Sequence, residues 1–254
     1  MTKTILITGS TDGIGLLTAK TLADMGHIVI LHGRSLNKLE SAKQDIGGDV
    51  ATYQADLSSL KETAKLAEAI AAKHNHIDVL INNAGVYKAA NPILPNGQDV
   101  RFVVNTLAPH VLTTALLPSM PSDGRIINLS SAAQAPVDLA ALAGDKHLDD
   151  MGVYAQSKRG IALWSAQMAA THPDGPLFIA VNPGSLLASK MVKEGFGVAG
   201  NDLQIGADIL CRLTLDDDFA SASGRYWDND AGAFGNINLG QASEVTKMIA
   251  ALAE

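Results

Sequence analysis

Residues 4–15, TILITGSTDGIG, join a short apolar strand to a glycine-rich turn, and a helical pattern follows over 14–25. The glycines recur with the spacing G-x-x-x-G-x-G. Gly9 allows a sharp turn, Gly13 allows the backbone to approach a phosphate group, and Gly15 allows the helix to pack on the strand. Because the first N–H groups of a helix have no partners within it, the helix could bind a pyrophosphate at its N-terminus. The alternative is a glycine-rich turn without a ligand.

Outside this turn, short apolar runs alternate with longer helical patterns along the chain. Almost continuously apolar strands separated by helices are typical of a parallel sheet covered on both faces. We therefore predict one doubly wound, Rossmann-type α/β domain over residues 1–254, with a parallel sheet of roughly seven strands. Strands are expected at 4–8, 27–32, 50–55, 77–82, 124–130, 176–182 and 224–228, and helices at 14–25, 36–46, 59–74, 99–118, 153–171 and 241–253. The stretch 184–205 fits no strand well and is predicted to be a mobile substrate segment.

The overall composition argues against several classes of partner. With 19 Lys and Arg against 26 Asp and Glu, the net charge is −7, which argues against nucleic acid bound through phosphate contacts. No apolar stretch reaches the roughly 18 residues that span a membrane, and the chain enters its first strand too early for a signal peptide. A single cysteine, Cys211, leaves no internal disulfide. We expect a cytoplasmic protein without a metal site.

A catalytic pair is predicted in YAQSK (154–158). Tyr154 and Lys158 are four residues apart, so on a helix they share a face, about 6 Å apart along the axis. A free tyrosine has a pKa of about 10, and a nearby ammonium group favours its phenolate form. Tyr154 could then serve as a general acid or base near neutral pH. A chance Tyr-x-x-x-Lys pair on an exposed helix is the alternative.

Further motifs follow in one order across nearly the whole chain: Asp56-Leu57, NNAG (82–85), Asn105, NLSS (128–131), YAQSK (154–158) and NPG (182–184). Together with the glycine spacing they resemble the short-chain dehydrogenase/reductase superfamily. The long insert before Tyr154 and the stretch SGRYWDND (223–230) are similar to its retinol-dehydrogenase-like members. The resemblance implies hydride transfer between a nicotinamide cofactor and a small-molecule alcohol or ketone.

The resemblance also implies roles for single residues. Ser131 is the catalytic serine of its pair, and its hydroxyl could donate to the substrate oxygen as charge develops there. Lys158 would also bind the nicotinamide ribose. The expected catalytic residues are Asn105, Ser131, Tyr154 and Lys158. The expected cofactor-binding residues are Gly9, Thr11, Asp12, Gly13, Ile14, Gly15, Arg34, Ser35, Asp56, Leu57, Asn82, Ala84, Gly85, Tyr154, Lys158, Pro183 and Gly184.

The end of the second strand selects between NAD and NADP. An acid there would bind the ribose hydroxyls, whereas a cation favours the 2′-phosphate. Gly33 stands where NAD-type members of the family carry the acid, and Arg34 follows, which can bind a phosphate bidentately. Ser35 is predicted to cap the next helix. We therefore predict NADP(H). Some NADP-dependent members have a second cation where this chain has Asp12, so Arg34 would discriminate alone; a solvated Arg34 is the alternative.

Pro109 lies in the middle of the helix expected over 99–118. It has no N–H to bond the carbonyl of Asn105, four residues earlier. By resemblance, that carbonyl holds a water that links Lys158 to solvent. The proline would thus free the acceptor that a proton relay needs, whereas a kink that serves packing only is the alternative.

The composition of two segments bears on the substrate, and the pattern of two helices bears on the assembly. The insert between Ser131 and Tyr154 and the stretch 185–200 are rich in Ala, Leu, Val and Met, which favours a largely apolar substrate over a sugar phosphate. His147, Asp149 and Asp150 are expected in a solvated turn, and the alternative is that they line the mouth of the substrate pocket. The helices at 99–118 and 153–171 are apolar on more than one face. By resemblance they would associate into a homodimer or homotetramer.

Two other functions could use the same fold. A dinucleotide-sensing regulator would be expected to lose Tyr154 or Lys158, and both are present. An epimerase or dehydratase would usually have a longer chain and a G-x-x-G-x-x-G turn. The sequence therefore favours an NADP-dependent alcohol dehydrogenase or carbonyl reductase.

Overall fold

The structure is a computed structural model that describes residues 1–48, 50–188, 193, 197 and 199–253. These residues form an eight-stranded sheet in the order β3-β2-β1-β4-β5-β6-β7-β8. β1 to β7 run parallel, and β8 pairs antiparallel with β7. The strands are β1 (Thr4–Ile7), β2 (Ile28–Gly33), β3 (Ala51–Gln54), β4 (Val79–Asn82), β5 (Arg125–Leu129), β6 (Leu177–Asn182), β7 (Tyr226–Asp228) and β8 (Ala233–Gly235).

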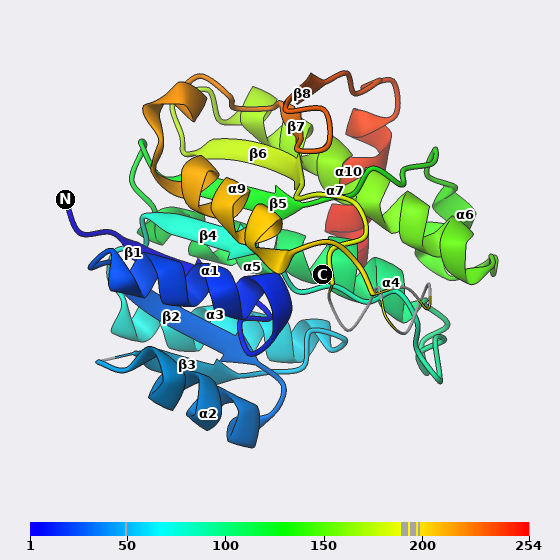
Figure 1. Cartoon of the computed structure of the whole chain (residues 1–254). Coiled ribbons are helices and arrows are strands. Elements are labelled where there is room, and N and C mark those ends of the chain that lie inside the picture. The colour runs from blue at the N-terminus through cyan, green and yellow to red at the C-terminus, as the bar shows by residue number, and fades with distance from the viewer. Residues whose placement is uncertain (49, 189–192, 194–196, 198, 254) are drawn as a thin grey trace.

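Helices cover both faces of the sheet, as the alternating pattern predicted (Figure 1). One layer holds α1 (Gly13–Asp24), α2 (Leu36–Ile46) and α9 (Leu203–Leu215), and the other holds α3 (Leu60–Lys73), α5 (Ala108–Leu116), α7 (Asp150–Thr171) and α10 (Ala242–Leu252). Each layer encloses its own apolar core against the sheet. Every residue of β4 and β5 is buried, which explains why these runs are almost continuously apolar. The α/β, doubly wound fold predicted from the sequence is confirmed.

The eighth strand is the main difference from the predicted sheet of roughly seven strands. β8 has only three residues, AFG, and lies where the sequence indicated a loop. It pairs with β7 through Trp227 opposite Phe234, whose rings meet edge to face with centroids 5.0 Å apart. This aromatic contact gives a short edge strand the side-chain packing that its glycine cannot supply.

The helix expected over 99–118 is divided into segments. α4 (Val100–Phe102) leads into a π-helical turn, η1 (Val103–Leu107), and then into α5 and a short 3-10 turn, η2 (Leu117–Ser119). The N–H of Ala108 bonds the carbonyl of Val103, five residues earlier. Pro109 therefore lies in the first turn of α5 rather than in the middle of a regular helix. At that place a missing N–H costs little, because the first N–H groups of a helical segment have few partners in it.

The segment Val100–Ser119 also corrects the expectation that no stretch is long and apolar enough to cross a membrane. Among the described residues it passes that test by length and composition, with a mean hydropathy of 1.3. However, 78% of the tested window is buried inside the protein. Its apolar residues pack against α3, α7 and the sheet, so we interpret it as a core segment of the fold.

Two loop regions also differ in detail from expectation. α7 begins at Asp150, three residues before the predicted start, and the insert before it contains the short helix α6 (Leu139–Ala143). In the stretch 184–205, Leu187 forms a parallel bridge with Asn201, and α9 begins at Leu203. Residues 189–192, 194–196 and 198 lie outside the described residues. The predicted mobility of this stretch stays a prediction.

Candidate active site

Most of the predicted site residues follow the carboxyl ends of parallel strands. The glycine-rich turn over residues 8–15, here called the phosphate turn, follows β1, Arg34 follows β2, Asp56 follows β3, Ser131 follows β5 and Pro183 follows β6. Because these strands are parallel, their carboxyl ends meet at one edge of the sheet, toward which the arrowheads of β4 and β5 point in Figure 1. Folds of this kind bind ligands at that edge.

The glycines of the phosphate turn allow a close-packed backbone. Gly9 has φ +65°, and a Cβ there would lie 2.9 Å from the Cα of Ala84. A Cβ on Gly15 would lie 2.6 Å from the carbonyl oxygen of Gly9. Among the residues that the structure describes, nothing lies within 4 Å of a Cβ placed on Gly13, which has φ +55° and begins α1. The backbone is thus tightly packed at Gly9 and Gly15 and open at Gly13, where α1 begins. This arrangement fits a pyrophosphate bound at a helix N-terminus.

Asn83 stabilises this turn through hydrogen bonds, a role that no motif predicted. Its Nδ2 donates to the carbonyls of Thr8 and Gly9 at 2.8 and 3.0 Å, and its N–H donates to Thr8 Oγ1 at 3.0 Å. Asn82, which the sequence favoured, points the other way and donates to Asn128 Oδ1 at 2.8 Å. A role for Asn82 beside the cofactor would therefore fall to its main chain. The only sequence signal for Asn83 was the doubled asparagine of NNAG.

His32 lies beneath the turn and joins it to β3. The N–H of Gly9 donates to His32 Nδ1 at 3.2 Å, and His32 Nε2 lies 3.2 Å from the carbonyl of Ala55. Since Nδ1 accepts, Nε2 must carry the proton and donate to Ala55. Burial lowers the pKa of His32 to about 4, so the ring is neutral near pH 7.

The end of β2 carries an exposed arginine and a serine that caps the next helix. Arg34 is exposed, and its carbonyl accepts a 3.0 Å hydrogen bond from Gln54 Nε2. Ser35 caps α2 as predicted, because its Oγ accepts from the N–H of Lys38. The Lys38 ammonium lies 3.0 Å from Asp12 Oδ2.

Asp56 and Leu57, after β3, differ in exposure and partners. Asp56 Oδ1 accepts from the N–H of Ser58 at 3.0 Å, and the Asp56 N–H donates to Glu62 Oε2 at 2.9 Å. The Leu57 side chain is buried in the core. Only the main chain of Leu57 is therefore left to contact a cofactor.

Tyr154, Lys158 and Ser131 come together at the same edge. Lys158 is buried, its Nζ donates to the Leu129 carbonyl at 2.7 Å, and it lies 5.8 Å from the centre of the Tyr154 ring. Burial lowers the pKa of Lys158 to about 8. Burial also raises the pKa of the Tyr154 phenol, while a hydrogen bond with Ser131 opposes this rise. The structure thus departs from the lowered tyrosine pKa that the sequence suggested, because burial outweighs the stabilisation of the phenolate. A protonated phenol is the form that can donate a proton to a carbonyl oxygen.

The two serines after β5 have different partners. Ser130 is buried, and its Oγ donates to the carbonyl of Lys158 at 2.7 Å, which ties β5 to α7. Ser131 Oγ accepts from the N–H of Ala133 at 3.1 Å and faces Tyr154. This arrangement supports Ser131, and not Ser130, as the serine that contacts a substrate.

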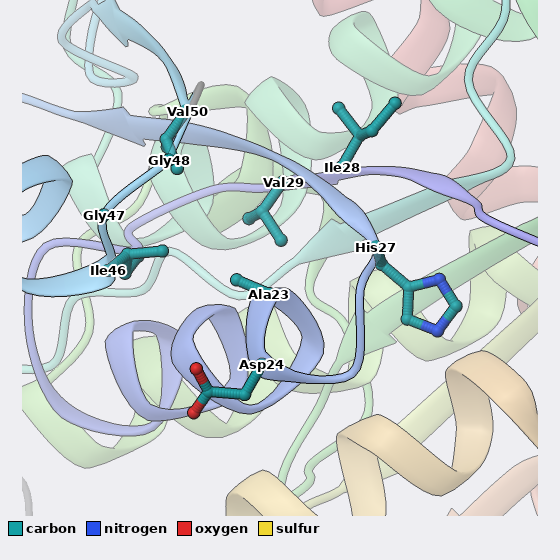
Figure 2. Close-up of a pocket in the computed structure, with 9 residues that line it drawn as sticks. All are labelled: Ala23, Asp24, His27, Ile28, Val29, Ile46, Gly47, Gly48 and Val50. Atoms are coloured by element: carbon teal, nitrogen blue, oxygen red, sulfur yellow. The ribbon is translucent and has the colours of Figure 1, made fainter.

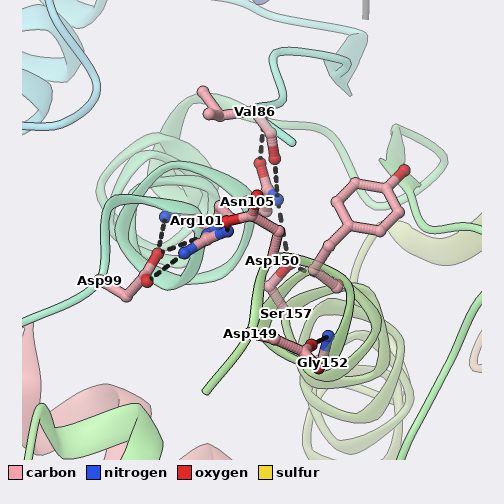
Figure 3. Close-up of polar contacts among 9 residues, drawn as sticks. Val86, Asp99, Arg101, Asn105, Asp149, Asp150, Gly152 and Ser157 are labelled. Carbon is pink, nitrogen blue, oxygen red and sulfur yellow. Dashed lines mark hydrogen bonds and ion pairs between the residues drawn. The ribbon is translucent and has the colours of Figure 1, made fainter. Parts of the chain in front are cut away.

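Asn105 holds α7 against the loop after β4 (Figure 3). Its side chain accepts from the N–H of Val86 at 2.8 Å, and donates to the Val86 carbonyl at 2.9 Å and to Ser157 Oγ at 3.0 Å. Asn105 therefore positions the helix that carries Tyr154 and Lys158. The proposed water between the Asn105 carbonyl and Lys158 stays a prediction.

A buried ion pair anchors the N-terminus of α7. The Arg101 side chain is 2% exposed and binds Asp99 through Nε at 2.8 Å and Nη2 at 2.6 Å. Its Nη1 contacts Asp150, and Asp149 caps α7 by accepting from the N–H of Gly152 (Figure 3). Asp149 and Asp150 are exposed, as expected for a solvated turn, and they also fix the start of the helix that carries Tyr154 and Lys158.

Known proteins resemble this chain in sequence and in fold. The family model for short chain dehydrogenases matches residues 3–196. The chain belongs to the short-chain dehydrogenase family. Human retinol dehydrogenase 13 is 30% identical over 89% of this chain and 76% of its own length. A short-chain dehydrogenase of Penicillium rubens is 34% identical over 88% of this chain and 85% of its own length.

Solved structures of the short-chain dehydrogenase family share the fold. A protein from Shigella flexneri 2a, described as a short chain dehydrogenase in complex with NADP, is 26% identical with a TM-score of 0.72 and covers 90% of this chain and 97% of its own. A similar protein from Escherichia coli CFT073, in complex with NADPH, is 26% identical with a TM-score of 0.70 and covers 89% of this chain and 96% of its own. A protein from Mycobacterium paratuberculosis has a TM-score of 0.77 over 98% of this chain and 90% of its own at 24% identity, which supports the fold alone.

One tyrosine of this short-chain dehydrogenase contacts Tyr154 and was not among the predicted site residues. Tyr87 is buried beside the catalytic pair, with its ring edge to face with Tyr154 at 5.1 Å between centroids. Tyr87 was missed because the loop after NNAG has no regular spacing.

Among the described residues, no three His, Cys, Asp or Glu are grouped so as to hold a metal ion.

A pocket elsewhere in this short-chain dehydrogenase does not belong to the site (Figure 2). It lies at the amino edge of the sheet, between the ends of α1 and α2 and the starts of β2 and β3. Its lining residues are Ala23, Asp24, His27, Ile28, Val29, Ile46, Gly47, Gly48 and Val50. The predicted site residues lie at the opposite edge.

Proposed function

We propose that this protein is an NADP(H)-dependent alcohol dehydrogenase or carbonyl reductase acting on a largely apolar small molecule. The observation that carries the proposal is the meeting of Tyr154, Lys158 and Ser131 at the sheet edge that also carries the glycine turn. A regulator that only binds a dinucleotide would not need this acid/base group. The family membership of the chain supports an oxidoreductase.

The roles of the catalytic residues follow from their contacts. Bound NADPH would supply the hydride. Ser131 donates a hydrogen bond to the substrate oxygen, and Tyr154 gives that oxygen its proton during carbonyl reduction. In the reverse direction Tyr154 takes the proton from the alcohol. Lys158, held by the Leu129 carbonyl, lies beside the Tyr154 ring and stabilises the phenolate that forms when the proton leaves.

The choice of NADP(H) rests on the end of β2. A glycine in place of an acid removes the partner that would bind free ribose hydroxyls, and the exposed Arg34 offers a fork of N–H donors to a phosphate. The proteins similar to this chain that were crystallised with NADP or NADPH support the same cofactor. Gly9, Gly13 and Gly15 would hold the pyrophosphate, with Pro183 and Gly184 at the nicotinamide end.

The remaining features of the proposal concern the whole chain. We propose one domain over residues 1–254, a cytoplasmic location and a homodimer or homotetramer. The substrate would lie between the insert that contains α6 and the stretch that follows Gly184. Both segments are rich in apolar residues, so a ketone or aldehyde with an aliphatic or aromatic body fits better than a sugar phosphate.

A direct test is NADPH oxidation against a panel of apolar ketones, apolar aldehydes and sugar phosphates, with NADH in parallel. We expect turnover with one or more apolar carbonyl compounds and a clear preference for NADPH. Turnover confined to sugar phosphates would contradict the substrate class. Tight NADPH binding without turnover of any carbonyl compound would favour the dinucleotide-sensing alternative.

A further inference from the structure

Lys38 connects two segments of the cofactor edge that are distant in sequence. It lies in the first turn of α2, and its N–H donates to the capping Ser35. Its side chain reaches across to the phosphate turn, where Nζ lies 3.0 Å from Asp12 Oδ2. The other carboxylate oxygen of Asp12 caps α1 by accepting from the N–H of Gly13 at 2.9 Å. One ion pair therefore joins the turn after β1 to the junction of β2 with α2.

The same two segments also touch next to this ion pair. A Cβ on Gly33 would lie 2.6 Å from Thr11 Cγ2, so the strand end and the turn are in close contact. Arg34 follows Gly33 and is exposed. Two cations, Arg34 and Lys38, and one carboxylate, Asp12, thus lie on the segments that this contact brings together.

We propose that Lys38 is a second cation of the 2′-phosphate site and helps to select NADP(H) over NAD(H). The inference rests on the proposed function. A phosphate monoester carries a charge of about −1.5 to −2 near pH 7. The Asp12 carboxylate would repel it, and Lys38 neutralises Asp12 while presenting N–H donors beside Arg34. The side chains of Lys38 and Asp12 are 55% and 62% exposed, so the ammonium can turn toward a phosphate without unfolding the helix.

The test compares the dissociation constants of NADPH and NADH, measured by fluorescence titration, for the wild type, Lys38→Gln and Lys20→Gln. Lys20 pairs with Asp45 at 3.3 Å and also joins α1 to α2, but near their C-terminal ends. It is thus a matched control for lost charge and for a lost surface ion pair. We expect Lys38→Gln to raise Kd for NADPH about tenfold and Kd for NADH less than about twofold. Lys20→Gln should change neither by more than about twofold.

Asp12→Asn tests whether Lys38 acts by neutralising Asp12 or by binding the phosphate itself. Asparagine caps helices as well as aspartate does, so the variant removes charge and keeps the cap. We expect tighter NADPH binding, by about threefold or more, and unchanged NADH binding. In the Asp12→Asn background, Lys38→Gln should still weaken NADPH binding, because Lys38 binds the phosphate itself. An unchanged Kd in that background would contradict direct binding by Lys38.

The outcomes distinguish this inference from the proposed cofactor. A wild type that binds NADH as tightly as NADPH would overturn the proposed cofactor and the role of Lys38 together. A wild type that prefers NADPH, with Lys38→Gln behaving like Lys20→Gln, would overturn the role of Lys38 alone and leave discrimination to Arg34. Equal weakening of both cofactors by Lys38→Gln would also overturn it.

Discussion

Ser130 and Ser131 are neighbours in the chain, yet their hydroxyl groups have different hydrogen-bond partners. The Ser130 hydroxyl is buried and bonds the carbonyl of Lys158, whereas the Ser131 hydroxyl faces Tyr154. We predict that Ser131→Ala lowers kcat at least about a hundredfold, the typical effect of losing a donor to a developing oxyanion. Ser130→Ala should cost about 1–3 kcal/mol of unfolding free energy and keep most of kcat.

Steady-state kinetics and urea unfolding of both variants check this prediction. Each substitution removes a single hydroxyl oxygen, so the variants serve as controls for one another. The reverse pattern, with activity lost in Ser130→Ala and kept in Ser131→Ala, would contradict the assignment of the catalytic serine.

His32 makes the stability of the protein depend on pH. Its pKa is about 4 in the folded protein, and the ordinary value is 6.5. Between these values the unfolded chain binds more protons, so the free energy of unfolding falls as the pH is lowered through this window. From pH 7 to pH 5 the loss through His32 is about 2 kcal/mol. His110, whose pKa burial also lowers to about 4, adds to the wild-type loss.

Unfolding by urea at pH 7 and pH 5 tests this assignment. In His32→Asn the loss between the two pH values should be smaller than in the wild type by about 2 kcal/mol. His147→Asn, at an exposed histidine, serves as the control and should behave like the wild type. An equal loss in His32→Asn and the wild type would contradict the role of His32.

At the scale of elements, the segment from α4 to α5 shows what an apolar pattern can and cannot predict. The spacing predicted one helix over 99–118, and its apolar residues do pack as one core segment. The pattern did not predict the π-helical turn η1, because residues 101–110 are all buried and leave no exposed face that would record a change of helical register. The proline is the local signal that the helix is not regular there.

Pro109→Ala tests whether this irregularity serves the proton relay. Alanine restores an N–H that can bond the Asn105 carbonyl and compete with a water held there. We expect a modest fall in kcat, a larger solvent deuterium isotope effect and a small rise in unfolding free energy. Wild-type values for kcat and for the isotope effect would leave Pro109 with a packing role only.

The kind of contact that a site residue makes explains whether its role could be predicted from the sequence. The motifs located Tyr154, Lys158, Ser131 and the glycine turn, because their chemistry depends on short spacings within one element. Asn83, Tyr87, His32 and Lys38 make contacts between segments that are distant in sequence, such as Lys38 with Asp12. No local spacing records such contacts. The short β8 was missed for a related reason, since three residues ending in glycine become a strand only by pairing with β7.

At the scale of the whole molecule, the apolar faces of α7 are largely used within the chain. α7 packs on β5 and β6, on α10 and on the segment from α4 to α5. The central position of α7 thus explains why this helix is apolar on more than one face. The predicted oligomer therefore rests mainly on the family resemblance. We still predict a homodimer or homotetramer. Light scattering at micromolar concentration checks it, and a monomer there would contradict it.

The central claim is that Tyr154 gives and takes the proton in an NADP(H)-dependent reaction. It is tested most directly by turnover and NADPH affinity of Tyr154→Phe, measured on the same preparation with a carbonyl compound that the wild type reduces. The substitution removes one hydroxyl and keeps the ring that packs against Tyr87. We predict turnover below about 1% of the wild type, with Kd for NADPH within about twofold. Turnover above a few per cent, with NADPH still bound, would contradict the claim.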